Sequence, residues 1–297
     1  MVLTPHFRLF FSAVCAAAFI ASAVGVPTLS QSDISLLQFA LTLEHLENAF
    51  YTGALQKYSD NDFEAAGLSS EIRGRYEQIL EHEREHENIL EVVLGVDAVA
   101  RCEYDFPYNS PLSFAALSGI FESVGTSAYI GASGLLSDKE VLTYGAAILG
   151  VEARQASWVN AAVLGRAPWN EGFDTPLSID AAYSLTSTFI SNCPSSNPPL
   201  QVQAFPPLTL SDASPSPGSS ITVSYNDSNE SCGLARYTAW FDGLQVEHSV
   251  LQEDGQTTVP PDLLGTAYVV VVCGLDTPSD KNMLSGFAVV QIPSDMD

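Results

Sequence analysis

The stretch FALTLEHLENAFYTGA, residues 39–54, has a close counterpart in AALSGIFESVGTSAYIGA, residues 115–132. Each contains a glutamate, a tyrosine seven residues further on, and then Gly-Ala after one intervening residue. Residues three, four and seven apart share one face of a helix, so each glutamate and tyrosine lies in line with apolar residues. The pattern predicts a repeated pair of helices with these inward-facing side chains: Glu44 and Tyr51 in the first, Glu122 and Tyr129 in the second.

The repeat predicts matching residues in two further helices. LEHEREHENIL, at residues 80–90, carries an E-x-x-H pair, and VEARQASW, at residues 151–158, carries an E-x-x-Q pair. A dinuclear carboxylate site in a helical bundle takes a glutamate from each of two helices and an E-x-x-H pair from each of the other two. The order along this chain therefore predicts a metal site with these candidate ligands: Glu44, Glu83, His86, Glu122, Glu152 and Gln155.

Helical periodicity and capping residues predict the extent of these helices. Each begins near Ser or Asp, which are preferred at a helix N-cap, and the expected spans are residues 32–55, 70–94, 110–136 and 137–165. Four such segments with short connections indicate a four-helix bundle. Residues 178–190 predict a shorter fifth helix, and we expect the bundle to occupy residues 26–193.

The composition changes after the helical region. Residues 194–207 are rich in Pro and Ser and lack helical periodicity, which is typical of a linker. Beyond them, short runs such as SSITVSY and TAYVVVVCGL are β-branched or aromatic and are bounded by turn residues. The predicted fold class is therefore mainly α, with a bundle followed by a small Ig-like β-sandwich at residues 208–297.

Charge and composition exclude one class of partner. The chain has 297 residues and is 46% hydrophobic, which is enough for a sizeable core. Eleven Lys and Arg against thirty-five Asp and Glu give a net charge of -24, which repels phosphate backbones and anionic membranes. We expect no binding to nucleic acid.

The first residues have the features of a secretory signal peptide. Arg8 precedes an apolar run that is followed by small residues, so we expect residues 1–25 to be removed. An uncleaved membrane anchor is the alternative, but the run is short for a span. No later segment is long and apolar enough to cross a bilayer, so we expect a protein that is secreted and extracellular or bound to the cell wall.

The cysteines and sequons agree with secretion. Removal of Cys15 with the signal peptide leaves an even number of cysteines, which in an oxidising compartment suggests two disulfides. Three pairings are possible. The pairing that keeps each bridge within one predicted domain joins Cys102 to Cys193 and Cys232 to Cys273. Two N-glycosylation sequons begin at Asn226 and Asn229.

Residues 31–165 resemble the ferritin-like domain of secreted fungal proteins of the stress-response or late sexual-development type, and more distantly plant desiccation-related proteins. FALTLEHLENAFY and VEARQASW carry most of the resemblance. The resemblance implies a ferritin-like four-helix bundle with a β-rich extension. By similarity to di-iron members, it implies iron or manganese ligands at Glu44, Glu83, His86, Glu122 and Glu152.

Gln155 departs from the di-iron pattern, which has histidine there. A neutral amide oxygen is a weaker ligand for iron than imidazole, so the site is expected to be mononuclear, manganese-preferring or empty. Tyr51 and Tyr129 are expected to donate hydrogen bonds to the carboxylates. Glu47 leans inward and is expected to assist as an outer carboxylate.

Two alternatives remain for the stretch at residues 80–90. His82-Glu83-x-x-His86 matches the H-E-x-x-H zinc motif, but no clear third ligand follows. The other alternative is a charged helix face in water, which we expect for Glu81, His82, Glu85 and Glu87. We also expect His45 to be exposed.

The expected function is metal handling or redox chemistry, such as metal oxidation or peroxide handling, in stress or development. The alternative is a non-enzymatic surface protein whose bundle kept the fold, with a polar core of protonated or hydrogen-bonded glutamates in place of the metal. A cell-wall or extracellular partner is expected to bind the β-sandwich. The sequence does not indicate an oligomeric state, and a glycosylated β-domain would obstruct a closed storage shell.

Overall fold

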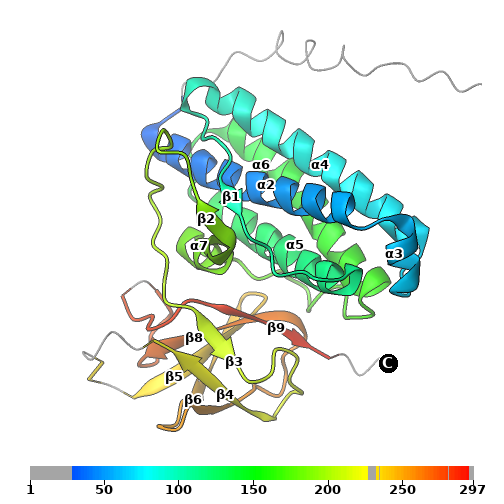
Figure 1. Cartoon of the computed structure of the whole chain (residues 1–297). Helices are drawn as coiled ribbons and strands as arrows, with labels where there is room; N and C mark the ends of the chain where they lie inside the picture. The colour runs from blue at the N-terminus through cyan, green and yellow to red at the C-terminus, as the bar shows by residue number, and fades with distance from the viewer. Residues whose placement is uncertain (1–28, 227–231, 234, 280, 294–297) are drawn as a thin grey trace, which may run out of the picture.

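The computed structural model describes residues 29–226, 232–233, 235–279 and 281–293. Within them, the long helices of the bundle are α2 (Gln31–Lys57), α4 (Ser70–Leu94), α5 (Pro111–Ser133) and α6 (Lys139–Trp158). Helix α2 packs along α4, and α5 packs along α6, as the repeated pattern predicted (Figure 1). The predicted four-helix bundle is confirmed.

The helix ends follow local chemistry. Ser30, Ser69, Ser110 and Asp138 are the N-caps, and each side chain accepts a hydrogen bond from a backbone N–H of the first turn. A short helix that the sequence pattern did not predict, α3 (Asp60–Ala65), lies between α2 and α4 and buries Phe63. Helix α6 continues into a π-helical turn, η3 (Val159–Val163), and a 3-10 turn, η2 (Gly95–Asp97), follows α4.

A small helix and a two-stranded ribbon cover one side of the bundle. Helix α7 (Ile179–Thr186) is followed by a 3-10 turn, η4 (Ser187–Phe189), and by β2 (Ile190–Asn192), which pairs antiparallel with β1 (Glu103–Tyr104). The predicted fifth helix therefore ends early, because the chain leaves it to pair with β1. A disulfide joins Cys102 to Cys193 beside this ribbon.

The C-terminal region forms the expected sandwich of antiparallel sheets. Within the described residues, one sheet has the order β3 (Leu208–Leu210), β4 (Ser220–Tyr225), β7 (Gln256–Thr258). The other has the order β6 (Gln245–Val250), β5 (Arg236–Asp242), β8 (Gly265–Cys273), β9 (Ala288–Ile292). Inward side chains of both sheets, such as Ile221 and Trp240, share one core. A disulfide joins Cys232 to Cys273.

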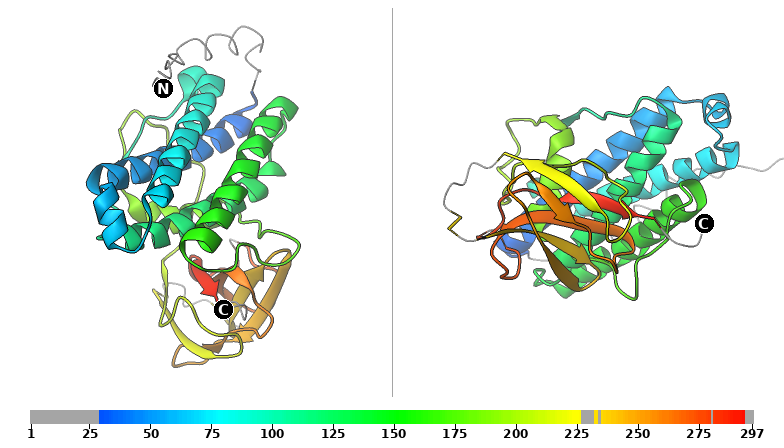
Figure 2. Two further views of the ribbon diagram at one scale, coloured as in Figure 1. Left: turned by 90° about the vertical axis from the view of Figure 1, so that its right-hand side faces the viewer. Right: turned by 90° about the horizontal axis from the view of Figure 1, so that it is seen from below.

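The sandwich packs against the bundle, and α7 forms part of the same contact (Figures 1 and 2). A shared apolar cluster contains Phe39 of α2, Val124 of α5 and Val270 of β8. The hydroxyl of Tyr268 donates to the backbone carbonyl of Ser123 over 2.8 Å, deep in this contact. The expected linker, residues 194–207, is also held against α7, where the backbone N–H of Phe205 donates to Ser184 Oγ.

Some expectations fall outside the described residues. These are the signal peptide at residues 1–25 and the glycosylation site at Asn229, whereas Asn226 is described and exposed. Among the helices that are described, none combines the length and the apolar character that a membrane span requires.

Candidate metal centre

The predicted ligands all lie inside the bundle. Helix α2 contributes Glu44, α4 contributes Glu83 and His86, α5 contributes Glu122, and α6 contributes Glu152 and Gln155. These residues are buried, with relative exposures of 7% or less. Glu47, one helical turn after Glu44, is buried in the same core.

Apolar layers above and below hold these side chains in the middle of the bundle. One layer is aromatic and includes Phe50, Tyr76 and Phe114, whose rings lie within 4.8–5.0 Å of a neighbouring ring in the cluster. The other is aliphatic and includes Leu41 and Leu90. Water is therefore excluded from both ends, and the carboxylates interact in a medium of low dielectric constant.

His86 is the centre of the arrangement. Its Nδ1 lies 3.1 Å from Glu83 Oε2, 3.1 Å from Glu152 Oε1 and 3.5 Å from Glu44 Oε2. One ligand atom from each of these residues lies within 4.8 Å of all the others. Three helices thus bring carboxylate oxygens and an imidazole nitrogen to one point.

The tyrosines of the repeat hold the outer carboxylates. Tyr51 on α2 donates to Glu122 Oε1 on α5, and Tyr129 on α5 donates to Glu44 Oε1 on α2. Each of these two helices thus donates one tyrosine hydrogen bond to a glutamate of the other. The repeat in the sequence therefore corresponds to a repeat in the contacts. Each bond fixes one carboxylate oxygen and leaves the other directed into the core.

Several buried polar atoms have no hydrogen-bond partner among the described residues. They include Glu122 Oε2, Glu152 Oε2 and Gln155 Oε1. An unsatisfied buried acceptor costs about 1–3 kcal/mol, and more when it is charged. Bound cations would supply partners for such oxygens. Carboxylate and amide oxygens with a single imidazole form a donor set suited to manganese or iron, so the residues present fit such an ion.

The carboxylates are electrostatically strained without a cation. Burial, followed by repulsion from neighbouring carboxylates, raises the pKa values of Glu47, Glu83 and Glu122 well above the usual range. Burial also raises the pKa of Glu152, to about 8, although its hydrogen bond with His86 acts in the opposite direction. Burial lowers the pKa of His86, but hydrogen bonds to Glu152, Glu44 and Glu83 outweigh it and raise the pKa strongly. The metal-free centre therefore retains protons that a metal ion would displace.

Gln155 occupies the position of the missing histidine. Its Nε2 donates to Glu83 Oε1 over 2.8 Å, which orients that carboxylate toward His86. Its Oε1 is the unpartnered amide oxygen. The side of the centre around Gln155 thus offers Glu122, Glu152 and an amide. The side around His86 has an imidazole.

Gly125 on α5 was not singled out from the sequence, yet it makes room for the centre. A Cβ atom at this position would lie 2.9 Å from Glu152 Oε2 and 3.2 Å from Glu47 Oε1. The absence of a side chain therefore lets carboxylates from α2 and α6 approach α5. The only sign of this close approach in the sequence is a glycine within the repeated helix. Helical spacing alone does not show why a glycine is needed there.

The expectation that His45 and Glu87 are exposed is wrong. Both are buried because the segment that follows η2 covers them. His45 Nε2 lies 3.0 Å from the carbonyl oxygen of Val99, and its Nδ1 lies 3.0 Å from Glu87 Oε1. Arg101 donates to both oxygens of Glu87 over 2.8 and 2.6 Å, and Asn48 donates to Oε2.

The group of His45, Glu87 and exposed Glu91 also brings possible ligand atoms together. Burial raises the pKa of Glu87, but His45 and Arg101 outweigh it, so the pKa is lowered. Because Arg101 and Asn48 already satisfy its oxygens, this cluster is a structural ion-pair network.

The zinc motif is not assembled as a ligand set. His82 is exposed, as are Glu81 and Glu85, in agreement with the charged-face interpretation. In the described part of the chain, His82 belongs to neither group of possible metal ligands. Its Nδ1 lies instead 3.4 Å from Gln155 Nε2, at the outer edge of the centre.

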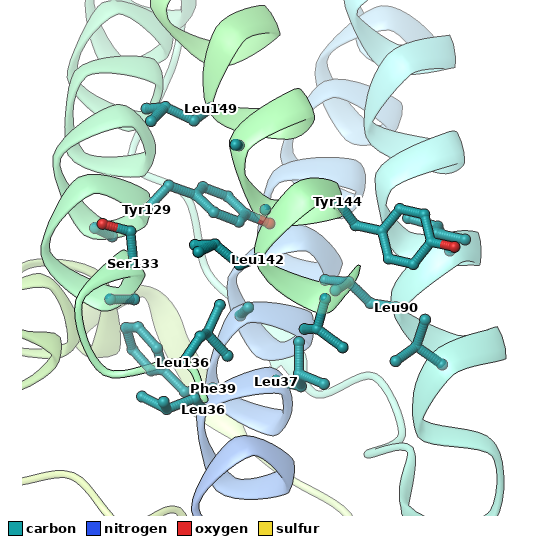
Figure 3. Close-up of a pocket in the computed structure, with 18 of the residues that line it drawn as sticks. Leu36, Leu37, Phe39, Leu90, Tyr129, Ser133, Leu136, Leu142, Tyr144 and Leu149 are labelled. Carbon is teal, nitrogen blue, oxygen red and sulfur yellow. The ribbon is translucent and has the colours of Figure 1, made fainter. Parts of the chain in front are cut away.

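An apolar cavity of about 70 Å³ borders the centre on the side of Tyr129. Figure 3 shows the Tyr129 ring entering it among Leu36, Phe39, Leu136 and Leu142. Since Tyr129 donates to Glu44, the cavity wall is one hydrogen bond away from a candidate ligand. The cavity provides an apolar boundary to the site on this side.

Residues 32–165 match the family described as Ferritin-like domain, and this part of the chain is a ferritin-like domain. Protein rds1 of Schizosaccharomyces pombe is 28% identical over 181 residues, which cover 61% of this chain and 45% of that protein. The chain therefore spans less than half of the length of this relative, and together these matches support the fungal ferritin-like family expected from the sequence. The crystal structure of a conserved hypothetical protein, rv2844, from Mycobacterium tuberculosis is 18% identical, with a TM-score of 0.38, over 45% of this chain and 98% of that chain.

Proposed function

We propose that this protein binds iron or manganese in the middle of its ferritin-like bundle and uses the ion in redox chemistry or metal handling. The observation that carries the proposal is the set of buried carboxylate and amide oxygens without partners around His86. Glu44, Glu83, His86 and Glu152 would hold one ion. Glu122, Glu152 and Gln155 would offer a second, weaker position.

The donor set favours manganese at the weaker position. Imidazole suits iron, whereas oxygen donors suit manganese, and Gln155 replaces an imidazole with an amide oxygen. When bound, such an ion supplies one-electron redox chemistry. Tyr51 and Tyr129 orient carboxylates through their hydroxyls, and the apolar layers exclude water from the carboxylates.

The proposal is tested by thermal unfolding of the purified, metal-depleted full chain with added manganese or ferrous iron under anaerobic conditions. Binding to the native state stabilises it by RT ln(1 + [L]/Kd), so the Tm should rise as metal is added. Glu152→Gln should abolish the rise, and Glu140→Gln, an exposed change on the same helix, should preserve it. No rise in Tm with either metal would contradict the proposal.

A metal-free structural protein is the second candidate. The raised pKa values of Glu47, Glu83, Glu122 and Glu152 favour it, because protonated carboxyls are tolerated in a buried core. The hydrogen bonds from the tyrosines would then serve stability alone. The same titration separates the candidates.

The proposal includes secretion and a role in stress or development outside the cell. The disulfides between Cys102 and Cys193 and between Cys232 and Cys273 support an oxidising compartment. Fractionation of the source cells, with N-terminal sequencing of the extracellular protein, tests secretion. Retention in the cytosol with reduced cysteines would contradict it.

A further inference from the structure

A groove of about 730 Å³ runs between α4 and α6 on the outside of the candidate metal centre. From α4 it is lined by Arg75, Ile79 and His82, and from α6 by Arg154 and Trp158. It is much larger than the apolar cavity and lies over Gln155, which forms part of its lining.

The charge of this groove is opposite to that of the protein. The chain has 35 acidic side chains against 11 Lys and Arg, yet the groove is lined by Arg75 and Arg154 with Glu71 as its one acidic lining residue among the described positions. Arg75 donates to the neutral Gln78 over 2.8 Å. Arg154 forms no ion pair or side-chain hydrogen bond with any described residue. Guanidinium groups without carboxylate partners are therefore available to an anion.

The groove also has an aromatic wall and a polar floor. Trp158 is half-buried, with its ring 5.3 Å from the ring of Tyr76 in an edge contact, so one part packs in the core and another faces the groove. Gln155 is buried and connects the floor to Glu83 through its 2.8 Å hydrogen bond. A flat organic molecule with a carboxylate would meet an aromatic surface and guanidinium groups together.

We infer that the α4–α6 groove is a binding site for a small aromatic carboxylate, held by Arg75 and Arg154 against Trp158 and placed next to Gln155. Metal cations are poor ligands for this groove, because its two arginines repel them. The inference does not depend on a bound metal, since the groups that would hold the ligand, Arg75, Arg154 and Trp158, lie outside the carboxylate cluster.

The test compares benzoate with benzamide, its neutral analogue of similar shape, in titrations of the full chain followed by the NMR shift of the Trp158 indole N–H. The expected result is saturable binding of benzoate and at least about tenfold weaker binding of benzamide. Arg75→Gln and Arg154→Gln should each weaken benzoate about fivefold, whereas Arg84→Gln, an exposed change on α4 outside the groove, should have no effect.

Equal binding of benzoate and benzamide, an equal loss with Arg84→Gln, or no saturable shift would each overturn the inference. Circular dichroism of the variants establishes that they are folded. Metal content is measured on the same samples, so the two proposals fail separately. Benzoate binding by a protein that takes up neither iron nor manganese when these are supplied would contradict the proposed function alone, and metal uptake without benzoate binding would contradict the groove alone.

Discussion

Tyr129 and Glu44 are joined by a hydrogen bond in the bundle core although they lie 85 residues apart in the sequence. Tyr51 and Glu122 form the matching bond in the opposite direction. Together they connect the two helix pairs at the level of the carboxylates, so they contribute to stability as well as to ligand orientation.

Tyr129→Phe should destabilise the metal-free protein by about 1–3 kcal/mol, because it leaves a buried carboxylate oxygen without its donor. Urea unfolding measures the change. Tyr144→Phe is the matched control, since its hydroxyl donates to the exposed Glu140 over 3.2 Å and should contribute less than about 0.5 kcal/mol. Equal effects of the two substitutions would contradict the assigned role of the bond.

The metal-free protein should lose stability as the pH rises from 5 to 8. The folded pKa of Glu152 is about 8 against an ordinary value of 4.5, so the native state binds more protons than the unfolded state in this window. The raised pKa of His86 acts in the same direction above its ordinary value of 6.5, because the native state keeps its proton while the unfolded state loses it. The lowered pKa of Glu87 affects stability only below about its ordinary value of 4.5.

Metal should reverse this trend, because it competes with protons for the same oxygens and binds more tightly as the pH rises. Urea unfolding at pH 5, 6.5 and 8 with and without manganese measures both slopes. We expect a fall on the order of a few kcal/mol for the metal-free protein across this range. A metal-free protein that becomes more stable with rising pH would show that the carboxyls are ionised in the core.

Gly125→Ala should weaken metal binding and destabilise the fold by about 1–3 kcal/mol, because the new Cβ meets the oxygens of Glu152 and Glu47. Gly150→Ala is the matched control in α6, where a Cβ has open space. It should stabilise the helix by up to about 1 kcal/mol. Denaturation and metal titration of both variants give the comparison, and a stabilising Gly125→Ala would contradict the close approach.

Gln155→His should raise the ratio of bound iron to bound manganese, since it supplies the second imidazole of the di-iron pattern. We expect about a tenfold change in relative affinity, measured by competition between the two ions. Gln78→His, at an exposed position on α4, controls for an added histidine. An unchanged ratio would show that residue 155 does not contact the ion.

Much of the fold could be predicted because its determinants are local. Serine and aspartate caps and apolar periodicity locate the long helices, and alternation locates strands such as β4. The six-residue α3 was missed because its periodic pattern is too short. The early end of α7 depends on pairing between β2 and β1, which lie far apart in the sequence.

In the candidate site, too, features that depend on local spacing could be predicted, and features that depend on contacts with other segments could not. Helical spacing places Glu44, Glu83 and Glu152 on inward faces, and the structure buries them. The burial of His45 and Glu87 could not be found this way, because it depends on Val99 and Arg101, which cover them from the segment after η2. The spacing of residues within one helix cannot predict a contact with another segment.

The most direct test is metal analysis of the full chain purified from cells supplied with both iron and manganese. We expect about one ion per chain or more, with most of it lost in Glu83→Ala and His86→Ala and retained in Glu85→Ala, an exposed change on the same helix. A folded protein without stoichiometric metal, or with metal that survives both core substitutions, would contradict the claim that this ferritin-like bundle holds an ion at its centre.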